Sequence, residues 1–330
     1  MYSEEELASA VESGVLTEAT AEAFRAHVAR MRDGPAVDEE RFRLVTGFND
    51  IFVVIACALL LAAVAAIGTT VAIWLGALGV VVASWGLAEF FVRKRHMALP
   101  AIVLVITFVG GLVVLGVNYI DNGTAGWVVG SVAAMIGAWL HWLRFRVPIT
   151  VALGVAAIIG AVVTLALSVV PDASSWTTAI TAVAGVVVFV LALRWDAADP
   201  LRQTRKSDVA FWLHLLAAPL LVRAVFGALG VSQGETTLGS ALVVVALYVM
   251  IALVSLAIDR RALMVAALGY VLFTFSALLN QYGVVSLGFA ITALAMGSAL
   301  LLLSAFWHRS RTLVLKCLPH AIQARLPSAQ

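Results

Sequence analysis

The sequence predicts an all-α, polytopic transmembrane helical bundle of about ten spans with both termini in the cytoplasm. Of its 330 residues, 62% are hydrophobic and 12% are charged, whereas a soluble domain contains about 45–50% apolar and about 25% charged residues. The apolar residues form ten runs of membrane-spanning length, and the basic residues occupy alternate loops between them. These observations exclude a secreted disulfide scaffold, a disordered protein and a nucleic-acid binder.

Charge divides the chain into three segments. Residues 1–49 are a cytoplasmic helical hairpin and connector, residues 50–308 are the ten-span domain, and residues 309–330 are a cytoplasmic tail. The first segment holds ten acidic residues and five arginines, so the membrane domain is basic. Its acidic start lacks the apolar core of a signal peptide. The two cysteines lie in such different settings that we expect neither a disulfide nor a metal pair.

The N-terminal segment is expected to contain two short helices. Ser3 and Glu6 have the spacing of a capping box, and Gly14 ends the first helix. Thr17 caps a second helix that runs to about Arg32. A hairpin of this size cannot bury a core of its own, so we expect it to dock against the basic inner loops or to bind a protein partner.

Ten apolar runs are predicted to cross the membrane, because a bilayer core of about 30 Å requires roughly 20 residues per helix. Prolines support several boundaries: Pro100 and Pro148 suit the first turn of a helix, and Pro171 ends one. The predicted spans are 51–68, 71–92, 100–120, 125–143, 147–170, 176–194, 208–229, 238–258, 262–281 and 284–307.

The basic residues predict the orientation. Of 21 lysines and arginines, 20 lie in the N-terminal segment or at alternate loops and the tail, and the exception is Arg223 inside the seventh span. Cytoplasmic loops are enriched in such residues. Both termini are therefore expected inside the cell, which agrees with an even number of spans.

Arginines recur at the inner ends of the spans. Arg93, Arg144, Arg194, Arg260 and Arg309 are separated by 51, 50, 66 and 49 residues. Two interpretations stay open: a duplicated hairpin unit, as in many transporters, or the natural repeat length of any helical hairpin with a short inner loop. The 66-residue separation, from Arg194 to Arg260, is longer than the others because it includes an extended inner loop, residues 195–207.

The seventh span contains the most informative polar residues. His214 lies roughly 10 Å inside it and Arg223 roughly 24 Å along it, at about 1.5 Å per residue. Pro219 between them is expected to kink the helix and free a backbone carbonyl. One interpretation is a substrate or proton site on a broken helix. The other is a packed polar residue and an arginine that reaches the membrane surface.

Three further ionisable residues lie near inner helix ends. Glu89 has the spacing of a helical ion pair with Arg93, His141 is one turn from the end of the fourth span, and Asp50 opens the first span. If these residues meet His214 in space, they form a cytoplasm-facing vestibule able to relay protons or bind a divalent ion. Each also has a purely structural interpretation, and we predict neither a bound metal nor a cofactor.

Two local motifs resemble a known group of proteins. They are Glu39-Glu40-Arg41-Phe42-Arg43 before the first span, and Asp208-Val-Ala-Phe-Trp-Leu-His214-Leu-Leu-Ala-Ala-Pro219. Together with the acidic hairpin, they resemble uncharacterised multi-pass inner-membrane proteins of bacteria, a domain-of-unknown-function family. The resemblance implies a bacterial cytoplasmic membrane and no particular activity.

The span count, the small extramembrane mass and the His214–Pro219–Arg223 helix favour a secondary transporter or flippase of a small or lipidic substrate. The expected partners are membrane lipid and a small-molecule substrate. The alternative is a non-transporting sensor or assembly subunit that acts through its N-terminal hairpin and the 195–207 loop. An enzyme acting on lipid is a third possibility, although no phosphate loop, nucleophile elbow or zinc motif is present.

Overall fold

A computed structural model describes residues 4–24, 48–120, 123–169, 176–199, 204–228, 238–260 and 288–316, with single positions at 264, 268 and 272. All regular elements in these ranges are helices. The chain divides into a small unit, residues 1–42, and a large unit, residues 43–329. We call the large unit the membrane unit.

The small unit begins with α1 (Glu4–Glu12). Gly14 adopts a left-handed conformation with φ of 73° and ends this helix, as predicted. A second helical segment follows over residues 18–24. Its cap is Thr17, whose Oγ1 accepts a hydrogen bond from the Thr20 N–H at 3.2 Å. The part of this helix predicted beyond residue 24 lies outside the described residues.

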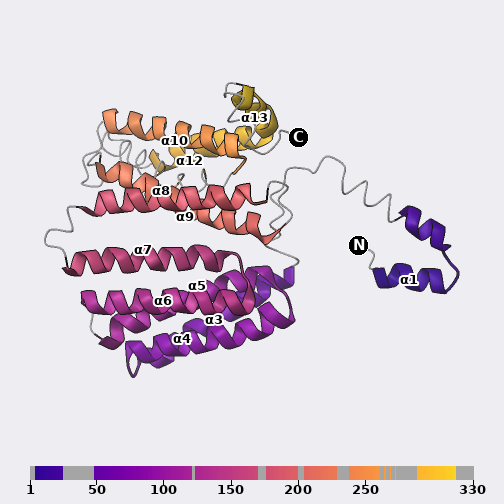
Figure 1. The fold of residues 1–330 in the computed structure, drawn as a ribbon, viewed down its shortest axis with the longest axis horizontal. Helices are drawn as coiled ribbons and strands as arrows, with labels where there is room; N and C mark the ends of the chain where they lie inside the picture. The colour runs from indigo at the N-terminus through magenta and orange to yellow at the C-terminus, as the bar shows by residue number, and fades with distance from the viewer. Residues whose placement is uncertain are drawn as a thin grey trace. The chain divides into compact units, whose positions relative to one another are not determined.

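The membrane unit is a bundle of helices laid side by side (Figure 1). Consecutive helices pack as antiparallel neighbours from α3 to α7, α8 pairs with α9, and α7 also packs against α9. The elements are α3 (Phe48–Thr69), α4 (Ile73–Ala88), η1 (Glu89–Lys94), α5 (Ala98–Ile120), α6 (Thr124–Phe145), α7 (Ile149–Val169), α8 (Thr177–Ala197), α9 (Arg205–Ala228), α10 (Leu238–Ile258), α12 (Gly288–Ala305) and α13 (Trp307–Lys316).

Within the described residues, seven helices are long and apolar enough to cross a membrane, from α3 to α9. They correspond to the first seven predicted spans, and α10 and α12 match the eighth and tenth. The ninth predicted span, 262–281, lies almost wholly outside the described residues. The chain is therefore a multi-pass helical membrane protein, as the composition predicted.

Glycines allow the closest approach between neighbouring helices. A Cβ added to Gly116 in α5 would lie 2.3 Å from the Cα of Gly130 in α6. Gly68 and Gly76 bring α3 and α4 together in the same way, with a corresponding distance of 2.5 Å. Because lipid provides no hydrophobic force between helices, close backbone contact of this kind supplies much of their attraction.

Three reversals of the chain use a left-handed residue that is not glycine. His96, Arg146 and Asp259 have φ values of 53°, 55° and 58° and follow η1, α6 and α10. After Asp259, the Arg260 N–H donates to the Ser255 carbonyl at 2.9 Å, which closes the end of α10. Beyond this closure, the Asp259 and Arg260 side chains contact different helices.

Candidate functional site

Three helices meet at the carboxylate of Asp196, in the last turn of α8. His214 Nε2 on α9 lies 2.8 Å from Asp196 Oδ2. Arg260, which follows α10, donates from Nε to Asp196 Oδ1 at 3.1 Å and from Nη2 to the same oxygen. The carboxylate therefore joins α8, α9 and α10 at one end of the bundle.

Hydrogen bonds engage both the guanidinium and the backbone carbonyl of Arg260. It is only 1% exposed. Its Nη2 donates to Ser207 Oγ at 2.9 Å and to the Ser207 carbonyl at 3.3 Å, and its own carbonyl accepts a hydrogen bond from the Ser255 hydroxyl. We call Asp196, Ser207, His214 and Arg260 the Asp196 network.

The His214 ring is completely buried. A charged carboxylate only accepts hydrogen bonds, so the Nε2–H tautomer of His214 fits its contact with Asp196. Nδ1 then carries a lone pair, and no hydrogen-bond partner meets it. On its other side, the His214 ring contacts the Phe189 ring in a T-shaped arrangement with centroids 5.5 Å apart.

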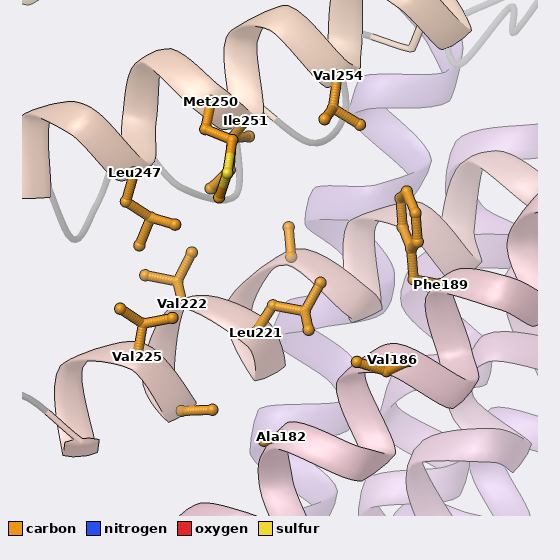
Figure 2. Close-up of a pocket in the computed structure, with 12 residues that line it drawn as sticks. Ala182, Val186, Phe189, Leu221, Val222, Val225, Leu247, Met250, Ile251 and Val254 are labelled. Carbon is orange, nitrogen blue, oxygen red and sulfur yellow. The ribbon is translucent and has the colours of Figure 1, made fainter. Parts of the chain in front are cut away.

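An apolar cavity of about 300 Å³ lies between α8, α9 and α10. Figure 2 shows side chains of α10 reaching from one side toward those of α8 and α9 on the other. Phe189 belongs both to the cavity wall and to the His214 contact. The described lining residues are all apolar: Ala182, Val186, Phe189, Ala218, Leu221, Val222, Ala224, Val225, Leu247, Met250, Ile251 and Val254.

A second contact connects α10 to α13. The Asp259 carboxylate accepts a hydrogen bond from Trp307 Nε1 at 2.8 Å, and Arg311 Nε lies 3.8 Å from the same oxygen. Asp259 and Arg260 are adjacent in sequence, so the left-handed turn directs one charge to α13 and the other to α8 and α9. The end of α10 is thus connected on both sides.

Of the residues predicted from the seventh span, only His214 belongs to the Asp196 network. Pro219 lies inside α9, which remains helical from Arg205 to Ala228, although proline cannot donate to the carbonyl four residues earlier. Arg223 is exposed. His214 and Arg223 are nine residues apart, about 13 Å along a helix, so they act at different depths.

His141 on α6 is also completely buried, but its surroundings are different. Its Nδ1 lies 3.3 Å from the Thr150 hydroxyl on α7. The rings of Trp85, Phe108 and Phe145 enclose it, with centroids 4.5 to 5.9 Å away. Among the described residues, no carboxylate contacts this histidine.

Glu89 forms an ion pair at the partly exposed end of the bundle. The Arg144 guanidinium donates to both its oxygens, at 2.7 and 3.0 Å. Arg93 lies 3.4 Å away, the predicted contact four residues along the helix. Asp50 is buried in the first turn of α3.

The predicted vestibule is therefore divided among separate contacts: Glu89 with Arg93 and Arg144, His141 with Thr150, and His214 with Asp196. Across the described ranges, no group of three or more His, Cys, Asp or Glu side chains is placed to hold a metal ion. The sequence indicated His214 by its depth in an apolar run. Asp196 and Ser207 fall in the predicted inner loop 195–207, and Arg260 was one of the recurring arginines at the inner ends of the spans.

No family model, curated protein or solved structure matches this chain.

Proposed function

We propose that this chain is a secondary transporter or flippase of a small or lipidic substrate, in a bacterial cytoplasmic membrane with ten spans and both termini inside. The observation that supports this proposal is the buried Asp196 network. Charged residues buried within a membrane bundle are rare, and by default they indicate a substrate or ion pathway.

The cavity supports an apolar or amphipathic substrate. Its described walls present only carbon and sulfur side-chain atoms, and its volume of about 300 Å³ is at the lower end of ligand sites. Phe189 separates it from His214 by one ring. A molecule in the cavity is therefore close enough to respond to the charge state of the network.

The test is transport by the full chain in liposomes. One probe is a fluorescent phospholipid, whose movement between leaflets is followed by chemical quenching, and the other is a lipophilic fluorescent dye. We expect Ala182→Phe, which fills the cavity, to lower transport by at least about tenfold, equivalent to roughly 1.4 kcal/mol of binding.

The matched control is Val183→Phe on the same helix. Val183 is 64% exposed and does not line the cavity, so this variant should transport normally. No transport by the unchanged chain, or equal transport by both variants, would contradict the proposal.

The second candidate is a membrane sensor or assembly subunit that binds a protein partner. It is favoured by the division of the chain, because residues 1–42 form a compact unit of their own. Deletion of residues 1–34 separates the two candidates: a transporter keeps its activity in liposomes, whereas a partner-binding subunit loses its function in the cell.

A further inference from the structure

We propose that the Asp196 network is a proton-binding site, in which protonation of His214 shifts Arg260 from Asp196 to Asp208 and moves α10 relative to α8 and α9. This inference rests on the proposed transport function, because it assigns the coupling ion of the same site.

The site of proton uptake is His214 Nδ1. Nε2–H already donates to Asp196, and Nδ1 is buried without a partner. An incoming proton bonds to the Nδ1 lone pair and makes the ring an imidazolium. Histidine is the side chain that ordinarily changes charge between pH 5 and 8.

The charges of the network change on protonation. With His214 neutral, the Arg260 guanidinium and the Asp196 carboxylate cancel. With His214 protonated, two cations share one carboxylate in a buried place, and an uncompensated buried charge is costly. An arrangement that gives each cation its own carboxylate removes this cost.

A second carboxylate is available to Arg260. Asp208 on α9 is partly buried, directly follows the Ser207 that already accepts from Arg260, and interacts electrostatically with that arginine. The other charged groups that act on Asp208 are Asp199 and Arg205.

Two segments next to Arg260 in the chain either have their charge engaged or contain none. Asp259 on the same turn as Arg260 is engaged with Trp307 and Arg311. The stretch 262–287, which includes the predicted ninth span, contains no Asp, Glu, His, Lys or Arg. In the proposed exchange, Arg260 moves between the Asp196 and Asp208 carboxylates, while the nearby Asp199 accepts hydrogen bonds from the Thr204 N–H and hydroxyl.

The exchange acts on the cavity through α10. Arg260 is attached two residues beyond the end of this helix, which supplies Leu247, Met250, Ile251 and Val254 to the cavity wall. A shift of Arg260 therefore changes the space between α10 and the α8–α9 pair, so that proton uptake alters access for the substrate.

The first experiment measures protonation of the full chain in lipid nanodiscs by nitrogen-15 NMR of its histidines. We expect one buried histidine to change from the singly to the doubly protonated form between pH 8 and pH 5. This signal should be absent from His214→Gln, whose amide still donates to Asp196 but takes up no proton, and present in the control His141→Gln. A His214 that stays neutral at pH 5 would overturn the proposal.

The second experiment measures the distance between spin labels at Val187 on α8 and Val249 on α10, two exposed positions, after Cys57→Ala and Cys317→Ala. We expect a change of about 2–5 Å between pH 8 and pH 5, the range of helix shifts. The change should vanish in His214→Gln. In Asp208→Asn it should vanish while His214 still takes up its proton.

A constant distance with a protonated His214, or a distance change that persists in Asp208→Asn, would overturn the exchange. Neither measurement requires a substrate. An intact proton response without transport would therefore contradict only the proposed function, and transport without a proton response would contradict only this inference.

Discussion

His141 and His214 are both completely buried in membrane-length helices, yet they belong to very different regions. His141 lies among aromatic rings and contacts a hydroxyl. His214 contacts a carboxylate that also binds a buried arginine. The sequence around each histidine is equally apolar, so the difference arises from what the neighbouring helices bring to it.

The same contrast holds for the ion pairs. In the α3–α7 region, Glu89 and Arg144 meet where the side chains are partly exposed. In the α8–α10 region, Arg260 and Asp196 also meet at one end of the bundle, but their side chains are largely buried. We infer that α3–α7 is held mainly by close packing, and that α8–α10 retains charges for which stability alone gives no reason.

The largest expected effect tests this contrast between ion pairs. Asp196→Ala leaves Arg260 buried without its carboxylate, and we expect it to lower the free energy of unfolding by about 3–5 kcal/mol. The measurement is an unfolding titration in mixed micelles. Asp196→Ala combined with Arg260→Met should recover part of the loss, because it removes the unpaired charge.

Glu89→Gln is the matched control in the other region. Its partner Arg144 is exposed to solvent and ions, so we expect no measurable change in the unfolding midpoint. Equal losses from the two substitutions would remove the distinction between the regions.

The two histidines provide the next comparison. Replacing His214 with phenylalanine removes a hydrogen bond to a charged group, and we expect a loss of about 1.5–3 kcal/mol. His141→Phe removes one contact of 3.3 Å in a site already made of aromatic rings, so its loss should be no more than about 1 kcal/mol. Unfolding titrations of the two variants at pH 8 measure both losses in the free energy of unfolding. A larger loss for His141→Phe than for His214→Phe would contradict this comparison.

The last comparison concerns the close packing of helices, in the α3–α7 region and in the α8–α9 pair. Gly116→Ala places a methyl group against the backbone of Gly130, and overpacking of this kind costs about 1–3 kcal/mol. On the same helix, Gly110→Ala meets open space and should stabilise by up to about 1 kcal/mol. In the α8–α9 pair, a Cβ added to Gly185 would lie 2.9 Å from a Leu221 methyl and 3.0 Å from the Leu221 backbone nitrogen. These distances are longer than those at Gly116, so Gly185→Ala should cost less than Gly116→Ala.

The helices themselves could be predicted because lipid imposes a length and a polarity on each span. The predicted eighth span, 238–258, coincides with α10. The pairing between helices could not be predicted. Gly116 of α5 and Gly130 of α6 are in close contact, but the spacing of glycines in the sequence defines only a helix face and not which helix that face meets.

The candidate site was only partly predictable for the same reason. His214 was indicated by its depth in an apolar run. Asp196 and Arg260 are 64 residues apart, and each lies at a helix end where a charge ordinarily faces water. Only the packing of α8, α9 and α10 turns these two charges inward. The non-glycine turn at Asp259, which directs Arg260, has no glycine signal in the sequence.

The unequal burial of α3 and α9 has a consequence for how the protein enters the bilayer. The α3 span has a mean hydropathy of 3.0 and is 11% buried, whereas the α9 span has 1.5 and is 44% buried. We therefore expect α3 to insert alone during synthesis, whereas α9, which contains Asp208, His214 and Arg223, should insert together with α8. Since Arg260 emerges from the ribosome later still, Asp196 in the α8–α9 hairpin has only His214 as its partner until α10 arrives, and that arrival completes the Asp196 network.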